Sequence, residues 1–246
     1  MIDKEKVKKH FSRGAKNYDV NAHLHRRIVS DLLAYLPGSK PQTIADLGCG
    51  TGLLTEEIRK KYPRARIVGV DLAPGMIEVA KSKVPGAEFI EVDAEELPFE
   101  RSSFDLLVSS SSFQWMDAEK VVREAGRVLK PGGQLVFSTF GEGTLKELEA
   151  LGFRIHQLPS LEEWRKQLSK RFASVQLESR IFREFFQSAK QLTDFLKTIG
   201  ARGAFGGEEL HPVDRLKFLS LRQNSGFIAT FNAIYGKARL QCFARP

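Results

Sequence analysis

The chain has 246 residues, of which 42% are hydrophobic and 28% charged, with a net charge of +8; this composition is typical of a soluble globular protein with a sizeable core. No apolar run is long enough to span a membrane, and the charged first ten residues lack the apolar segment of a signal peptide, so we expect a cytoplasmic protein. Cys49 and Cys242 are too few for a disulfide framework, and no Cys/His spacing predicts a metal site.

The first predicted element is helical, and regular alternation of strands and helices follows it. Residues 3–36 carry apolar side chains at helical spacing, with a break expected near residues 14–19, and residues 37–39 form a loop. Alternation of this kind predicts a parallel, doubly wound α/β sheet, which binds ligands at the carboxyl ends of its strands. We expect strands at 43–45, 66–70, 88–92, 104–109 and 134–139, helices at 53–61, from 74 onward and at 118–129, and a turn at 130–133.

After residue 140 the alternation loosens. Helices are expected at 143–151, 161–170, 189–199 and 212–222, a glycine-rich loop at 203–207, and two further strands at 175–185 and 227–242. The pattern predicts a mostly parallel, seven-stranded, Rossmann-like sheet. We expect a helical lid at 1–40, a core at 41–187 and 226–246, and a second helical lid inserted at 188–225.

The segment 44–52, Ile-Ala-Asp-Leu-Gly-Cys-Gly-Thr-Gly, predicts a strand, a tight turn and the start of a helix. Gly48, Gly50 and Gly52 allow a sharp turn and close approach of a ligand to the backbone, since no Cβ intervenes. The helix N-terminus behind them offers free N–H groups. Asp46 would repel a dinucleotide pyrophosphate, so the segment favours a ligand that carries an amino group beside a carboxylate.

Two more acids and a run of serines end the next predicted strands. Asp71 can accept hydrogen bonds from two ribose hydroxyls, and Asp93 can accept one from an adenine amino group. The serines, Ser109 to Ser112, leave space for a ligand. A single Asp often ends a strand as a turn former, but three acids at consecutive strand ends indicate one site.

These motifs, with Leu-Lys-Pro-Gly-Gly at 129–133, resemble the class I S-adenosylmethionine-dependent methyltransferases over residues 41–140. The flanking segments at 11–19, 137–148, 196–201 and 229–235 extend the resemblance to the malonyl-[acyl-carrier protein] O-methyltransferases of biotin synthesis. Two residues depart from that family's pattern: His25 stands where Gln is expected, and Phe140 where Leu is usual.

The resemblance implies methyl transfer from S-adenosylmethionine to the free carboxylate of a malonyl thioester, on acyl carrier protein or coenzyme A, early in biotin (pimeloyl) synthesis. S-adenosylhomocysteine is the implied product, with no metal, nucleic acid or membrane involved. A carboxylate, with a pKa near ~4, is already a nucleophile at neutral pH and needs no general base. Positioning of the reacting groups can supply ~7–11 kcal/mol.

The resemblance also implies roles for individual residues. Cofactor-binding residues are expected to be Asp46, Gly48, Gly50, Gly52, Asp71, Leu72, Met76, Asp93, Ala94 and Ser109. Tyr18 and Gln114 are the expected catalytic residues, and the residues expected to contact the substrate or its carrier are Phe113, Trp115, Arg180, Arg183 and Lys190.

The charge distribution bears on the partner. Residues 1–40 carry a net charge of +5, residues 41–150 of −5 and residues 151–246 of +8, so basic flanks could attract an acidic carrier protein or simply be solvated. Three alternatives stay open: a methyltransferase acting on a quinone ring or a dicarboxylic acid, a nucleic-acid methyltransferase or RNA-binding module, and a cofactor-binding protein without catalysis. The basic pI of about 9.5 favours the second, but no Asn/Asp-Pro-Pro-Tyr motif follows the fourth strand.

Overall fold

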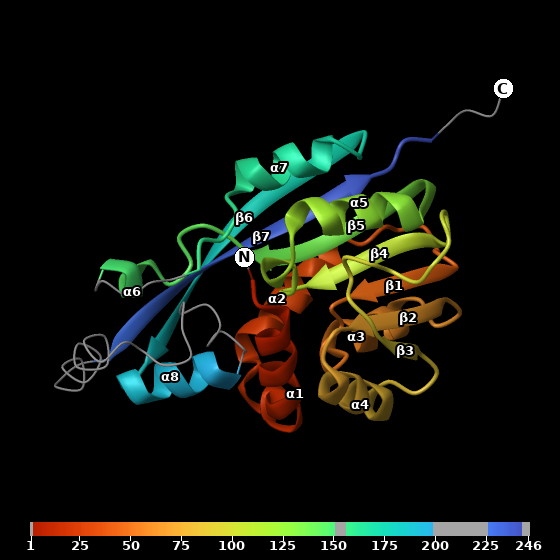
Figure 1. The fold of residues 1–246 in the computed structure, drawn as a ribbon. Coiled ribbons are helices and arrows are strands. Elements are labelled where there is room, and N and C mark those ends of the chain that lie inside the picture. The colour runs from red at the N-terminus through yellow and green to blue at the C-terminus, as the bar shows by residue number, and fades with distance from the viewer. Residues whose placement is uncertain (1, 151–155, 199–225, 243–246) are drawn as a thin grey trace.

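The computed structural model describes residues 2–150, 156–198 and 226–242. Within these ranges the chain forms a seven-stranded sheet with helices on both faces (Figure 1). The strand order is β3-β2-β1-β4-β5-β7-β6. The strands are β1 Thr43–Leu47, β2 Arg66–Asp71, β3 Glu88–Glu91, β4 Phe104–Ser110, β5 Leu129–Phe140, β6 Ser174–Phe186 and β7 Phe227–Arg239. The helices are α1 Lys4–Asn21, α2 His23–Leu32, α3 Leu53–Lys61, α4 Pro74–Lys83, α5 Ala118–Val128, α6 Lys146–Ala150, α7 Leu161–Ser169 and α8 Ala189–Thr198, with short 3-10 helices η1 Leu33–Tyr35 and η2 Phe113–Trp115.

The first five strands pair in parallel, and β7 inserts antiparallel between β5 and β6. The parallel strands therefore end at one edge of the sheet, where the order reverses between β1 and β4. The predicted fold class, a doubly wound and mostly parallel seven-stranded sheet, is confirmed. No helix in the described ranges is long and apolar enough to cross a bilayer.

Each central strand buries both of its faces, because successive side chains point to opposite sides. Ile44 packs in the layer formed with α2 and α3, whereas its neighbour Ala45 faces the layer formed with α5 and α7. Leu106 and Leu107 in β4 divide in the same way. The near-continuous apolar runs of the sequence thus become two hydrophobic layers around one sheet.

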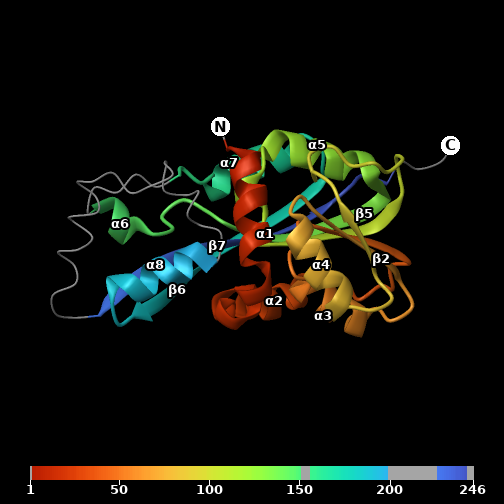
Figure 2. The same cartoon turned by 60° about the horizontal axis from the view of Figure 1, so that its bottom comes forward.

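The last two strands form a long antiparallel pair that extends beyond the central strands, and α8, which follows β6 in the chain, packs on it (Figures 1 and 2). Phe182 and Phe186 of β6 are buried against Phe195 of α8. On the opposite face, Phe185 pairs with Ile228 across the strands, and both are at least half exposed.

The N-terminal helices differ from the prediction. The expected break near residues 14–19 is wrong: α1 continues through Gly14 to Asn21, and the chain breaks at Ala22. Asp3 caps the helix by accepting a hydrogen bond from the Lys6 backbone N–H at 3.1 Å. Helix α1 also packs against α4 and α8, and these tertiary contacts outweigh the low helix propensity of one glycine (Figure 2).

Strand β5 also differs, since it begins at Leu129 and includes the expected turn at 130–133. Leu129 pairs with Phe104, and the register shifts between Phe104 and Leu106, so the Pro-Gly-Gly segment forms an irregular start of the strand. The loop expected at 203–207 and the helix at 212–222 lie outside the described residues. The division into a core and two lids stays a prediction.

Gly75 allows the close crossing of α1 and α4. A Cβ at this position would lie 2.5 Å from the Ser12 carbonyl oxygen and 2.9 Å from the Ser12 Cα, which are backbone atoms that cannot rotate away. The approach of the N-terminal helix to the sheet edge therefore depends on this glycine.

We expect Gly75→Ala to destabilise the protein by ~1–3 kcal/mol, because overpacking outweighs the gain in helix propensity. Urea unfolding measures the loss. Gly38→Ala is the matched control, since a Cβ at Gly38 meets nothing within 4 Å. Equal stability of the two variants would show that α1 can shift away from α4 without cost.

Candidate functional site

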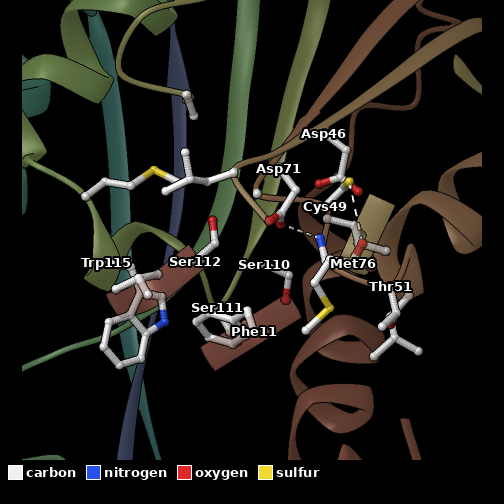
Figure 3. A pocket seen from close by; sticks show the side chains of 18 of the residues that line it. Phe11, Asp46, Cys49, Thr51, Asp71, Met76, Ser110, Ser111, Ser112 and Trp115 are labelled. Atoms are coloured by element: carbon white, nitrogen blue, oxygen red, sulfur yellow. Dashed lines mark hydrogen bonds between the residues drawn. The ribbon is translucent and has the colours of Figure 1, made fainter. Parts of the chain in front are cut away.

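A pocket lies at the carboxyl edge of the parallel strands, with about 900 Å³ of empty space when the adjoining open solvent is included. The strand ends and the glycine loop form its floor, and α1 and α2 cover it. Figure 3 shows Asp46 and Asp71 on one side of this pocket and Trp115 on another. The sequence elements expected to meet at the edge do meet there.

The glycine loop adopts left-handed backbone conformations that favour glycine. Gly48 and Gly50 have φ angles of 68° and 54°, and both line the pocket. A Cβ at Gly50 would meet nothing within 4 Å, so the backbone there is open to a ligand. Gly52, with φ of 83°, does not line the pocket, and a Cβ there would lie against Val84 and Ala80 of the α4 region; its expected contact with a cofactor stays a prediction.

Asp46 places an unpartnered carboxylate oxygen at the pocket. The side chain is 1% exposed, and its Oδ2 accepts a hydrogen bond from Thr55 Oγ1 at 2.6 Å. Its Oδ1 has no hydrogen-bond partner within the described part of the chain. Burial, with a smaller effect from the neighbouring Asp71, raises the pKa of Asp46 to about 7. A cationic amino group would satisfy the free oxygen and stabilise the charged form.

Asp71 is held by backbone donors on both of its oxygens. Gly50 N–H donates to Oδ2 and Ala73 N–H to Oδ1, each at 2.8 Å. Burial raises the pKa of Asp71, and these backbone hydrogen bonds oppose the rise. A carboxylate has about four acceptor positions, so two remain for hydroxyl groups of a ligand.

Asp93 is joined to the N-terminal helix. Lys4 forms ion pairs with Asp93 and with Glu95, the latter at 2.6 Å, and Asp93 Oδ1 also accepts from the Glu95 backbone N–H at 3.0 Å. Lys4 itself lines the pocket. Sequence reasoning missed this lysine, because an ion pair across 89 residues leaves no local pattern.

Three expected site residues shape the wall without lining the pocket. Ser109 Oγ donates to the Leu47 carbonyl oxygen at 2.7 Å, and Phe113 is buried in the core beside Phe137. Gln114 Nε2 donates to the Ser111 carbonyl oxygen at 2.6 Å. Its Oε1 accepts from Thr139 at 3.0 Å, so both ends of the amide are engaged within the protein, and a catalytic role for Gln114 has no support.

Other residues predicted from sequence do line the pocket: Leu72, Met76, Ala94, Trp115 and Tyr18. The prediction left space for a ligand at Ser109 to Ser112 but named only Ser109 as a contact, and it omitted apolar residues of the helices. The residues missed are Lys4, Val7, Phe11, His25, Val29, Cys49, Thr51, Leu53, Leu54, Val92, Ser110, Ser111, Ser112 and Met116. For the glycine-loop members and the serines, adjacency to the predicted residues was the available signal.

Tyr18 and His25 form an aromatic group over the pocket. Their ring centroids are 5.7 Å apart, and Tyr18 also lies 6.3 Å from Phe11, whose ring contacts Trp115 edge-on at 5.8 Å. Burial raises the pKa of Tyr18, so its phenol stays protonated. Burial lowers the pKa of His25 to about 4, so its imidazole is neutral at pH 7.

The basic residues expected to contact a partner lie away from the pocket, on β6 and α8. Arg180 pairs with Glu178 at 2.8 Å and with Asp31 at 3.3 Å. Arg183 is exposed and forms no ion pair with any described residue. The side chain of Lys190 lies outside the described residues. No cluster of His, Cys, Asp or Glu in the described ranges is suited to hold a metal ion.

The raised pKa of Asp46 predicts a pH-dependent loss of stability in the ligand-free protein. Between pH ~4, the ordinary pKa of an unfolded Asp, and pH 7, the folded state holds a proton that the unfolded state has lost. Unfolding free energy therefore falls as pH rises through this window. We expect Asp46→Asn, which cannot ionise, to be more stable than the wild type at pH 8 by ~1–4 kcal/mol and nearly equal at pH 4.5.

Urea titrations at the two pH values test this expectation. Asp105→Asn is the control, because the pKa of Asp105 is shifted in the opposite direction to that of Asp46. Burial acts to raise the pKa of Asp105, but hydrogen bonds from Lys130 and Thr43 outweigh burial and lower it. Losing Asp105 should cost stability at pH 8. An Asp46→Asn variant that is destabilised equally at both pH values would show that Asp46 is ionised throughout.

Comparison with known proteins agrees with this geometry. A family model described as a methyltransferase domain matches residues 45–137, which include the acids of the pocket. The chain resembles the phosphoethanolamine N-methyltransferase 2 of Haemonchus contortus, solved with S-adenosylhomocysteine, at a TM-score of 0.58 and 22% identity, over 87% of this chain and 53% of that one. At this identity the likeness shows the fold.

Two curated relatives cover nearly the whole chain. The malonyl-[acyl-carrier protein] O-methyltransferase of Geobacter sulfurreducens is 33% identical, over 96% of this chain and 98% of its own. The protein of the same name from Halalkalibacterium halodurans is 32% identical, over 91% and 90%. With a methyltransferase pocket at the strand ends and full-length similarity of this kind, the chain belongs to the malonyl-[acyl-carrier protein] O-methyltransferase family.

Proposed function

We propose that this protein transfers a methyl group from S-adenosylmethionine to the free carboxylate of a malonyl thioester on acyl carrier protein. The observation that carries the proposal is similarity over nine-tenths of the chain to relatives named for that activity. The product, a methyl ester, would mask the charged end of the chain and let it serve as an early intermediate in the synthesis of the pimeloyl part of biotin.

The pocket supports S-adenosylmethionine as the methyl donor. The unpartnered Oδ1 of Asp46 fits an ammonium group, and the free acceptor positions of Asp71 fit ribose hydroxyls. Leu72, Met76 and Ala94 supply an apolar surface for adenine near Asp93. When bound, S-adenosylmethionine supplies an activated methyl group on a sulfonium.

The residues of the pocket need not move a proton. A malonyl carboxylate is ionised at neutral pH, so no base is required to generate the nucleophile. The protonated phenol of Tyr18 can donate a hydrogen bond to the acceptor, and the rings of Phe11 and Trp115 exclude water. Orientation and desolvation then account for the acceleration.

We expect Tyr18→Phe to lower kcat about 10-fold or more while changing the cofactor Kd less than about 3-fold, because the phenol would act mainly on the acceptor. Labelled S-adenosylmethionine and malonyl-carrier protein are incubated with the enzyme, and base-labile methyl ester is counted. Tyr35→Phe, outside the pocket, is the control. Lack of ester with wild-type protein overturns the proposed function; normal turnover in Tyr18→Phe makes Tyr18 a packing residue.

The carrier protein is proposed to dock on the basic part of the β6–α8 region, at Arg180, Arg183 and Lys190. Of these, Arg183 is the cleanest to test, because it lies exposed on β6 and forms no ion pair with any described residue, whereas Arg180 already bridges Glu178 and Asp31.

We expect Arg183→Glu to raise KM for malonyl-carrier protein about 2- to 5-fold and to leave KM for malonyl-coenzyme A unchanged, since a surface ion pair contributes ~0.2–1 kcal/mol. The difference should shrink at 1 M salt, where the screening length is about 3 Å. Arg101→Glu, in an exposed turn, is the control. If both thioesters are affected equally, the variant has changed the pocket and not the docking surface.

A further inference from the structure

His25 combines burial with unused hydrogen-bonding capacity. It lies on α2, is 5% exposed and lines the pocket. Its Nδ1 has no hydrogen-bond partner, and neither ring nitrogen bonds to any other residue that the structure describes. An unsatisfied buried polar group costs ~1–3 kcal/mol, so an apolar residue would stabilise this position better. A ligand that hydrogen-bonds to the imidazole would explain why a histidine occupies this buried position.

The position of His25 separates it from the acids of the pocket. Helix α2 packs against β4 and β5, and the His25 ring lies edge-on to Phe140, the last residue of β5, at 5.9 Å between centroids. Asp46 lies in β1, Asp71 ends β2 and Asp93 follows β3, all on the other side of the topological switch. His25 thus stands beside Tyr18 on the β4–β5 side of the switch, away from the strands that carry the three carboxylates.

The chemistry of a carboxylate acceptor favours a neutral donor here. An arginine or lysine would hold the anion strongly but would also withdraw charge from the attacking oxygen. Lys4, the one cation lining the described pocket, is engaged by Asp93 and Glu95. Burial and the nearby His23 lower the pKa of His25 to about 4, so the ring keeps a single N–H and no charge at neutral pH.

We propose that His25 binds the methyl acceptor: its neutral ring donates a hydrogen bond to the carboxylate oxygen that does not attack, beside the phenol of Tyr18. This assignment rests on the proposed function. In the reaction an O–CH₃ bond forms at the other carboxylate oxygen as the S–CH₃ bond breaks, and its electron pair remains on sulfur. The negative charge of the acceptor and the positive charge of the sulfonium cancel, so His25 keeps its proton throughout.

Two variants distinguish hydrogen bonding from packing. His25→Phe keeps an aromatic ring beside Tyr18 and Phe140 but removes the donor, whereas His25→Gln keeps a donor. Binding of malonyl-coenzyme A and acetyl-coenzyme A is titrated in the presence of S-adenosylhomocysteine, so that no turnover occurs. Acetyl-coenzyme A lacks the carboxylate, and the ratio of the two Kd values therefore measures recognition of that group alone.

We expect wild-type protein to bind malonyl-coenzyme A at least 10-fold more tightly than acetyl-coenzyme A, and His25→Phe to lose most of this preference, as expected for a hydrogen bond to a charged group. His25→Gln should retain it within about 3-fold. The Kd for S-adenosylhomocysteine should be nearly unchanged in both variants, and the Tm of His25→Phe should not fall, because an apolar ring removes an unsatisfied buried group. The ¹⁵N-histidine spectrum of the wild type should contain one signal that the spectrum of His25→Gln lacks, which assigns that signal to His25. Malonyl-coenzyme A should shift this signal, and acetyl-coenzyme A should not.

Each contrary result has a distinct meaning. A malonyl preference that persists in His25→Phe, or a His25 signal that malonyl-coenzyme A leaves in place, overturns the assignment of His25 alone. Weaker binding of S-adenosylhomocysteine in His25→Phe, in proportion to the loss for malonyl-coenzyme A, assigns His25 to the cofactor or to packing. Wild-type protein that shows no malonyl preference and forms no methyl ester overturns the proposed function together with this assignment.

Discussion

The hydrogen bond from the Gly50 N–H to Asp71 joins the glycine loop after β1 to the end of β2, and the rest of the site depends on it. The Val70 carbonyl oxygen reinforces the junction by accepting from both Gly48 N–H and Cys49 N–H, at 2.8 and 2.9 Å. These bonds hold the loop in the left-handed conformations from which α3 begins. They also fix Asp71 in a half-buried position, where an unanchored carboxylate would be costly.

The N-terminal helix balances the charge that this edge concentrates. Near the start of α1, Lys4 forms ion pairs with Asp93 and Glu95, and Lys8 forms one with Glu91 at 2.7 Å. At the other end of α1, Asp19 accepts a hydrogen bond from Thr51 and forms an ion pair with Lys83. Partly exposed pairs of this kind are individually weak, so their joint effect is to orient α1 across the pocket. The backbone contact of Gly75 with Ser12 then sets how closely the helix can approach.

The pocket suits a reaction between two ligands that are already activated. The two side chains beside the proposed acceptor, Tyr18 and His25, are uncharged, and Lys4 and Asp71 are engaged by neighbouring groups. A neutral, aromatic environment neither protonates a carboxylate acceptor nor competes with it for an electrophilic methyl group. The structure thereby links a property of the fold, burial under α1 and α2, to the absence of any need for a base in the proposed chemistry.

The sequence by itself determined the sheet, the glycine turn and the acids at the strand ends, because each depends on local periodicity and on which residues can end a parallel strand. Only the tertiary structure decided which neighbours face the ligand. Ser109 turns toward Leu47, Gly52 lies beside α4 and Gln114 bonds to Ser111 and Thr139, since strand register and helix packing set those directions. Lys4 and His25 reach the pocket from helices far from the glycine loop, through contacts that no spacing in the chain encodes.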